Sequence, residues 1–330
     1  MSAVLVLVEI VDGAPDRLSL EALRFASSLG SPLEAALIGP PGVAAAAAGL
    51  GSYGVTTAYV VEDDRLTAYA AAASATALAA VHESGGFAAV VAPGSERATE
   101  ILAHLAARTG LPLATNVVAV DPGERWRVTR QRWAGSLLED AWLDGEPKLL
   151  TVAPHVVAAA EPAAGAAGAA GAAAATVVPV AATIADIDLR AAVRTVEPTG
   201  GDRVSLAEAK VVVGGGRGLG SAEAFDMLDE LAGLLGAAVG VSRVATSLGW
   251  RPHAQQVGQT GTRIAPDIYI ACGISGAIQH IVGCKSAKRI LAINTDRDAP
   301  IFLKATYGVI GDVHQVVPAI AAEVRRARGL

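Results

Sequence analysis

Cysteine is scarce in this sequence of 330 residues, and the two that occur, Cys272 and Cys284, match no metal-binding spacing. Two cysteines cannot supply the framework of a disulfide-rich secreted domain. We therefore expect no metal site and no disulfide framework. The sequence also lacks an obvious pair of acid and base residues for chemistry on a small substrate, so we expect no catalytic residue of that kind.

Long, strongly apolar runs are also missing. Hydrophobic residues make up 52% of the chain and the mean hydropathy is +0.44, but alanine and glycine cause most of this. The longest candidate, residues 158–175, contains Glu161 and Pro162 and lacks the Leu, Ile and Phe that drive membrane insertion. Residues 1–10 lack the positive region of a signal peptide. These features predict a bacterial cytoplasmic protein without direct membrane insertion.

Charge is unevenly distributed along the chain. The net charge is -6, yet residues 209–330 carry 13 Lys and Arg against 9 Asp and Glu. A positive C-terminal region suits an anionic ligand such as a dinucleotide, but it is too weak for a nucleic-acid-binding surface. A chance asymmetry of solvated faces explains the same numbers.

The first 150 residues alternate apolar strands with helical stretches, which is typical of a parallel α/β sheet. Residues 125–152 interrupt this pattern, contain Trp126, Trp133 and Trp142, and predict a few antiparallel strands. The expected strands are 4–10, 33–38, 55–60 and 88–92, and the expected helices are 18–29, 66–83 and 96–109.

An Ala/Gly tract at about residues 158–175 separates this region from the rest of the chain. It has no large apolar residue to bury, so it predicts a flexible surface loop; a polyalanine helix is the competing interpretation. A second α/β unit begins near residue 209, with strands at 210–213, 238–242, 268–271 and 289–294 and helices at 222–235 and 313–328. We predict two α/β domains, 1–204 with a mostly parallel sheet and 205–330 with a Rossmann-like fold.

The first candidate binding motif is the segment Val-Val-Val-Gly-Gly-Gly-Arg-Gly-Leu-Gly at 211–220. A strand that ends in a glycine-rich turn before a helix lets the backbone approach a phosphate. The spacing departs from the dinucleotide fingerprint, because Leu219 occupies the position of the third glycine. This departure argues against a nicotinamide-dependent dehydrogenase, and a purely structural turn stays open for the motif alone.

Two further clusters follow. Residues 257–261 read Val-Gly-Gln-Thr-Gly and place an amide and a hydroxyl on an open backbone. Residues 268–280 take an apolar strand into a turn with Ser275 and then to Gln279 and His280. A serine and free backbone N–H groups suit a phosphate, although each cluster alone is also compatible with an ordinary turn or a surface helix.

Together and in this order, these motifs resemble the alpha subunit of the electron transfer flavoprotein family. The resemblance runs from about Val211 to Asp312. It includes the glycine-arginine turn, Ser-Arg at 242–243, Gln-Val-Gly-Gln-Thr-Gly at 256–261, Ser-Gly-Ala-Ile-Gln-His at 275–280, Asn294, Ala-Pro-Ile-Phe at 299–302 and Tyr-Gly at 307–308. The first 200 residues match only in general layout.

The resemblance implies that the C-terminal domain binds FAD and that three residues tune the flavin. Arg243 would lie against the flavin ring, Thr260 would form a hydrogen bond with N5, and a partly or fully protonated His280 would face the N1/O2 edge and raise the potential. The cofactor-binding residues implied are Arg217, Ser242, Arg243, Gln256, Gln259, Thr260, Gly273, Ser275, Gly276, Gln279, His280, Asn294 and Asp312. The histidines at 253 and 314 lie outside the shared motifs and remain unassigned.

The resemblance also implies partners. The N-terminal domain would contact a beta subunit that holds AMP, and the heterodimer would carry electrons from an acyl-CoA or related dehydrogenase of fatty acid oxidation to a quinone oxidoreductase. The two domains would move about a junction near residues 195–208. A bifurcating form, which oxidises NADH and holds a second FAD in the beta subunit, remains an alternative. An NAD-dependent enzyme and a cofactor-free scaffold are the alternatives from other classes.

Overall fold

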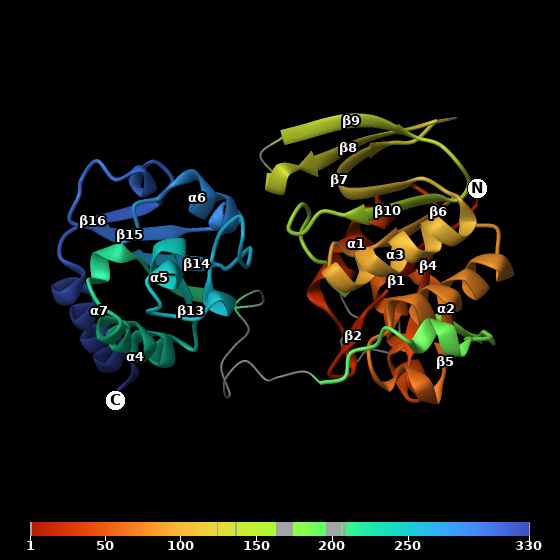
Figure 1. Ribbon diagram of the computed structural model, residues 1–330, viewed down its shortest axis with the longest axis horizontal. Coiled ribbons are helices and arrows are strands. Elements are labelled where there is room, and N and C mark those ends of the chain that lie inside the picture. Colours follow the sequence, from red (N-terminus) through yellow and green to blue (C-terminus); the bar gives the residue numbers. More distant parts are fainter. Residues whose placement is uncertain are drawn as a thin grey trace. The chain divides into compact units, whose positions relative to one another are not determined.

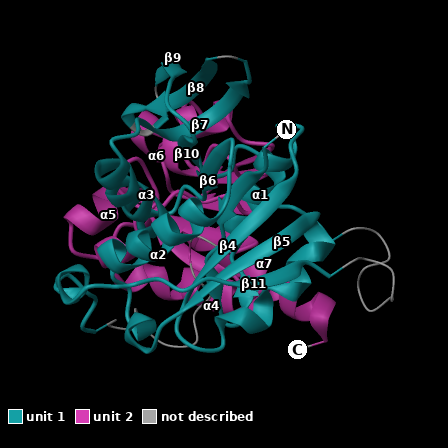
Figure 2. Ribbon diagram, turned by 90° about the vertical axis from the view of Figure 1, so that its right-hand side faces the viewer, with its two compact units in different colours: residues 1–196 teal, residues 197–330 magenta. Residues whose placement is uncertain are grey.

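The computed structural model describes residues 2–123, 125–135, 137–162, 174–195, 206 and 209–329, and the chain divides into two compact units, residues 1–196 and 197–330 (Figures 1 and 2). Most of the Ala/Gly tract (residues 163–173) lies outside the described residues. So do the domain boundary predicted at residue 205 and most of the predicted junction. Within the described part of the chain, no helix combines the length and apolarity that crossing a membrane requires.

The sheet of the first unit is built from short apolar strands whose side chains alternate between two helical layers. On β1 (Val4–Leu7), Val4 and Val6 join the core beneath α1 (Arg17–Ser27), while Leu5 and Leu7 join the core beneath α2 (Ala71–Ser84) and α3 (Glu96–Thr109). A strand buried on both faces must be apolar throughout, which is why the apolar runs located these strands correctly.

Nine strands form this sheet within the described residues. In sheet order they are β11 (Thr176–Pro179), β5 (Val55–Glu62), β4 (Leu33–Gly39), β1, β6 (Ala89–Ala92), β10 (Lys148–Val152), β7 (Leu113–Asp121), β8 (Trp126–Arg132) and β9 (Leu137–Leu143). The pairings from β11 to β7 are parallel, and β7–β8 and β8–β9 are antiparallel. A two-stranded ribbon of β2 (Ile10–Val11) and β3 (Ala14–Pro15) follows β1.

The expectation of antiparallel strands across residues 125–152 is therefore correct for β8 and β9 and wrong for β10. After the β8–β9 hairpin the chain returns into the sheet, where β10 runs parallel to both β6 and β7. All five residues of β10 are buried. Burial on both faces is the usual environment of a parallel strand, whereas the hairpin before it is partly solvated.

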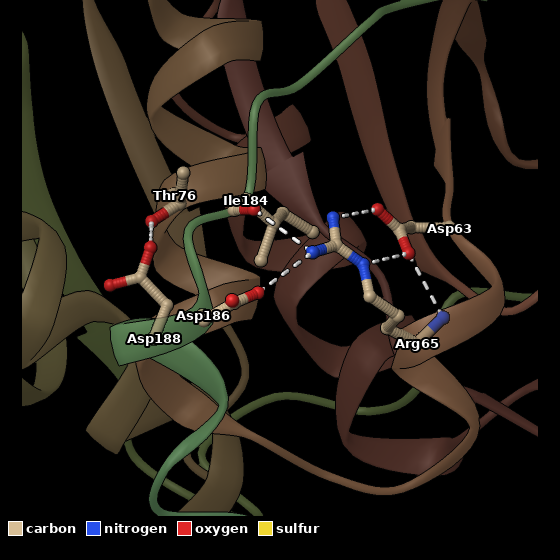
Figure 3. A network of polar contacts seen from close by, with 6 residues as sticks. All are labelled: Asp63, Arg65, Thr76, Ile184, Asp186 and Asp188. Atoms are coloured by element: carbon tan, nitrogen blue, oxygen red, sulfur yellow. Dashed lines mark hydrogen bonds and ion pairs between the residues drawn. The ribbon is translucent and has the colours of Figure 1, made fainter.

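A polar network fastens the last segment of this unit to its helices (Figure 3). Asp188 accepts a hydrogen bond from Thr76 Oγ1 on α2 at 2.8 Å. It also accepts one from Arg108 of α3 at 2.7 Å, which the figure does not draw. Nearby, the Arg65 guanidinium donates to the Ile184 carbonyl oxygen at 3.1 Å. Burial raises the pKa of Asp188, but the hydrogen bonds from Arg108 and Thr76 outweigh it, so this pKa lies below its ordinary value.

The sheet of the second unit has five strands, all parallel, among residues 209–329. Their order is β13 (Ala238–Val241), β12 (Val211–Gly215), β14 (Ile268–Cys272), β15 (Ile290–Asn294) and β16 (Tyr307–Ile310). One face is covered by α4 (Asp226–Leu235) and α7 (Val313–Arg328), while α6 (Ile278–Cys284) and residues 257–264 contribute to the core on the other. A short helix, α5 (Arg243–Ser247), follows β13.

We expect Asp188→Ala to lower the free energy of unfolding by about 2 kcal/mol, because it removes the carboxylate and leaves the Arg108 guanidinium and the Thr76 hydroxyl with only the longer contact to the Ala72 carbonyl oxygen. Urea unfolding of the purified chain measures this change. Asp186→Ala is the matched control, since that carboxylate is fully exposed and lies 3.8 Å from Arg65; it should leave stability unchanged. Equal losses in the two variants would show that the Asp188 contacts contribute nothing specific.

Candidate functional site

The candidate site lies where the strand order of the second sheet changes direction. The chain leaves β12 to form β13 on one side and then returns to form β14 on the other side of β12. The connections that follow β12 and β14 therefore diverge at the carboxyl ends of these strands. In open parallel sheets, ligands bind in the crevice at such a point.

A cavity of about 740 Å³ occupies this position. This volume is typical of small-molecule sites, which span roughly 300–1,000 Å³. Its walls come from the loops after β12, β13 and β14, from the end of β15, from α5 and α6, and from the loop at 256–260. The lining residues include Arg217, Gly218, Ser242, Arg243, Gln256, Gln259, Thr260, Gly273, Ser275, Gly276, Gln279, His280, Asn294 and Asp296.

Every cofactor contact expected from the sequence lines this cavity except Asp312. Asp312 caps helix α7, where its carboxylate accepts a hydrogen bond from the His314 backbone N–H at 2.9 Å. The amide of Asn294 lines the cavity but is engaged at both ends, donating to the Ile274 carbonyl oxygen and accepting from the Asp296 N–H, each at 3.0 Å. Asn294 thus holds the loops after β14 and β15 together.

Two loops of the cavity touch through their backbones. Gly218 donates its N–H to the Gly273 carbonyl oxygen at 3.0 Å. A Cβ atom on Gly218 would lie only 2.7 Å from the Gly273 Cα, and Gly273 itself has a φ of +62°. Glycine is required at such a close approach and favoured at such a backbone angle. The glycine turn is therefore compatible with both a structural role and a ligand-binding role, because the contact between the two loops shapes the wall of the cavity.

The cavity offers groups that suit an anionic dinucleotide. Arg217 and Arg243 supply positive charge, and neither forms an ion pair within the described part of the chain. The hydroxyl of Ser242 is buried and lacks a hydrogen-bond partner among the described residues. A buried hydroxyl without a partner costs free energy, which a phosphate oxygen at this position would recover. The residues present therefore fit FAD.

His280 is anchored below the cavity by a residue that the sequence motifs did not single out. The hydroxyl of Tyr269, on β14, lies 2.8 Å from His280 Nε2, and both side chains are buried. Room for the phenol comes from Gly214 on the neighbouring strand, where a Cβ atom would lie 2.2 Å from the Tyr269 oxygen. The sequence did carry one signal for this contact: Tyr269 is the one aromatic residue in an otherwise aliphatic strand. A buried tyrosine hydroxyl usually has a polar partner.

Burial keeps His280 neutral. It lowers the pKa of His280 to about 4 because the charged imidazolium loses hydration, and the Val257 backbone offsets only part of this. The protonated imidazole implied by the resemblance is therefore not supported by the protein groups around it. Burial also raises the pKa values of Cys272 and Cys284 to about 12, so both remain thiols at neutral pH.

A second polar contact set lies beside the cavity. The buried amide of Gln256 bridges two hydroxyls: Thr246 Oγ1 donates to Oε1 at 2.7 Å, and Nε2 donates to Thr260 Oγ1 at 2.9 Å. Thr246 was not among the residues expected at the site. A threonine inside a short helix carries no sequence signal that distinguishes this contact from a solvated hydroxyl.

Two family models match this chain. The electron transfer flavoprotein domain matches residues 4–185, and the electron transfer flavoprotein FAD-binding domain matches residues 205–285. The chain belongs to the electron transfer flavoprotein alpha-subunit family. It is 41% identical over 330 residues to the electron transfer flavoprotein subunit alpha of Mycobacterium tuberculosis and 39% identical to that of Mycobacterium leprae, with full coverage of each chain. It is also 35% identical to that of Bacillus subtilis, over 98% of this chain and 97% of the relative.

The family assignment confirms the resemblance from the sequence, and the two mainly parallel sheets confirm the two α/β domains that the strand–helix pattern predicted. Membership supports a role in electron transfer and a flavin in the second unit, because the model that covers 205–285 describes an FAD-binding domain. An alpha subunit also implies a beta-subunit partner. The cavity lies within this same unit, so the FAD-binding assignment and the observed geometry agree.

The lowered pKa of His280 predicts a pH-dependent stability. Between the ordinary pKa of about 6.5 and the folded-state value of about 4, the unfolded state binds a proton that the folded state does not. The contribution of neutral His280 to the free energy of unfolding is therefore fully present above pH 6.5 and is lost as the pH drops towards 4. From pH 7 to pH 5 we expect His280 to account for a loss of about 2 kcal/mol in the free energy of unfolding.

The measurement is urea unfolding at several pH values, compared between the unmodified chain and His280→Gln. The variant should lose this part of the pH dependence, while His314→Gln, which replaces an exposed histidine, should retain it. If His280→Gln has the same pH profile as the unmodified chain, then His280 is not held neutral by burial.

Proposed function

We propose that this chain binds FAD in the cavity of its second unit and carries electrons as one half of a heterodimer with a beta subunit. When bound, FAD supplies the one-electron chemistry at its isoalloxazine ring. A flavoprotein dehydrogenase of the acyl-CoA type delivers the electrons, and a quinone oxidoreductase removes them. AMP occupies the beta subunit, and the complex works in the cytoplasm. The observation that carries the FAD assignment is the buried Ser242 hydroxyl, which has no partner in the described part of the chain and lies in a cavity that also contains two arginines.

The residues of the cavity divide by chemistry. Ser242, Ser275 and Gln279 offer hydrogen-bond donors for the pyrophosphate, and Arg217 adds positive charge nearby. Towards the flavin ring, Arg243 stabilises the negative charge that reduction adds. Gln259 contacts the polar edge of the ring and Thr260 contacts N5. His280 lies near the ring, where burial by the protein favours its neutral form; Asp312 caps α7 and does not line the cavity.

The surface of the first unit supports a protein partner. The β8–β9 hairpin exposes large apolar side chains, with Trp133 77%, Leu138 69% and Trp142 58% exposed. Exposed aromatic and aliphatic groups gathered on one element are typical of an interaction surface. We assign this hairpin to the contact between the N-terminal unit and the beta subunit.

The test is to co-express the chain with its beta subunit, purify the complex, and record its absorption spectrum and extracted nucleotides. One FAD and one AMP per dimer would support the simple carrier. Two FAD would instead indicate a bifurcating form with a second flavin in the beta subunit. A colourless complex that binds no FAD would contradict the proposal.

Ser242→Ala should weaken FAD binding by about fivefold to tenfold, which corresponds to one lost hydrogen bond. Fluorescence titration of the flavin-free complex measures the dissociation constant. Ser221→Ala is the matched control, because Ser221 is not among the residues that line the cavity, and it should bind FAD as the unmodified protein does. Unchanged affinity in Ser242→Ala would remove the pyrophosphate role of this hydroxyl.

A further inference from the structure

The amide of Gln256 is held in place by burial, by two hydroxyl partners and by a backbone that is itself anchored. The side chain is only 2% exposed. Its backbone N–H donates to the His253 carbonyl oxygen at 2.9 Å, and its carbonyl oxygen accepts from the Thr262 N–H at 2.7 Å. The side chain therefore cannot leave the space between Thr246 and Thr260. The remaining freedom of the amide is its orientation, since a half-turn exchanges the oxygen and the nitrogen.

Thr246 decides which end of the amide faces Thr260. Its hydroxyl has one proton and two acceptors within hydrogen-bond distance, Gln256 Oε1 at 2.7 Å and the Arg243 carbonyl oxygen at 2.9 Å, and the proton goes to the nearer of them, Oε1. With Oε1 held by Thr246, Nε2 faces Thr260 and donates to its oxygen at 2.9 Å. An oxygen that accepts from an amide keeps its own proton available for another partner.

That available proton belongs to a side chain at the cavity. Both residues line the cavity, but Thr260 is exposed whereas Gln256 is buried. The chain of donors thus runs from Thr246 through Gln256 to Thr260 and ends in an O–H group that a ligand can accept. The opposite amide orientation would place Oε1 beside Thr260, take up its proton, and present lone pairs to the ligand instead.

We propose that Thr246 and Gln256 are positioning residues that make Thr260 a hydrogen-bond donor towards N5 of oxidised FAD. This inference rests on the proposed function, because it requires the flavin ring beside Thr260. N5 of oxidised flavin is an acceptor, so a donor at this position favours its binding. Thr246 needs no contact with the flavin itself; it acts by holding the amide in one of two orientations.

The test compares two ligands that differ only at the accepting atom. In 5-deaza-FAD a C–H group replaces N5, so it cannot accept the hydrogen bond. Dissociation constants for FAD and 5-deaza-FAD are measured by fluorescence titration of the flavin-free complex of the full chain with its beta subunit. The ratio of the dissociation constant for 5-deaza-FAD to that for FAD, measured in Thr260→Val, is the baseline. We expect this ratio to be about five to ten times larger in the unmodified protein.

Thr246→Val retains the shape of the side chain but removes the hydroxyl, so we expect the FAD preference to fall to near the Thr260→Val baseline. Thr246→Ser restores the hydroxyl and should restore the preference. In Gln256→Glu at pH 8, two carboxylate oxygens accept from both threonines, so the preference should also be lost. Binding of 5-deaza-FAD by each variant shows that the cavity is still folded, because this ligand does not use the N5 contact.

The outcomes distinguish the positioning role of Thr246 and Gln256 from the binding of FAD itself. Loss of preference in Thr246→Val and Gln256→Glu, with recovery in Thr246→Ser, supports the inference. An unmodified protein that shows only the Thr260→Val ratio would overturn it, since Thr260 would then not donate to N5. A Thr246→Val variant that weakens both ligands equally and keeps the preference would overturn the role of Thr246. Failure of the unmodified complex to bind FAD at all would refute the proposed function itself.

Discussion

The contact between the loops that follow β12 and β14 is the constraint on which the cavity depends. The Gly218 N–H meets the Gly273 carbonyl oxygen, and neither residue has a Cβ atom to hold the loops apart. Because the strands are parallel, the loops after β13 and β15 leave the same edge of the sheet. The backbone geometry at this edge therefore sets the Cα positions from which the polar side chains of the loops extend into the cavity.

Beneath the cavity, polar side chains from different segments satisfy one another. Tyr269 forms a buried hydrogen bond with His280, and Gln256 forms a partly buried one with Thr246, so strand, helix and loop are joined. Each such contact restricts the arrangement of the segments that it joins, whereas a buried polar atom without a partner is costly. Among the described residues that line the cavity, the buried side-chain atoms without a partner are Ser242 Oγ and His280 Nδ1. Unused hydrogen-bonding capacity is thus located where a ligand is expected.

Much of this architecture could be predicted from the sequence, because its signals are local. Helix α3 begins after the capping Ser95 and ends at Gly110, so its bounds matched the expected 96–109. The binding motifs also located the cavity, since their residues follow strands that end at one edge. The placement of β10 depends on its neighbours in space and carries no local signal. The neutral state of His280 depends in the same way on tertiary burial, which a helical histidine in a sequence does not reveal.

The close approach of Gly214 to Tyr269 joins two positions that are far apart in the sequence. The Tyr269 hydroxyl occupies the space that a side chain at position 214 would need. Neither residue can change independently: a larger residue at 214 would displace the phenol, and loss of the phenol would leave both a void and an unpaired imidazole. Positions 214 and 269 should therefore covary among relatives. A relative with a larger residue in place of the glycine at 214 should also have a smaller residue in place of the tyrosine at 269.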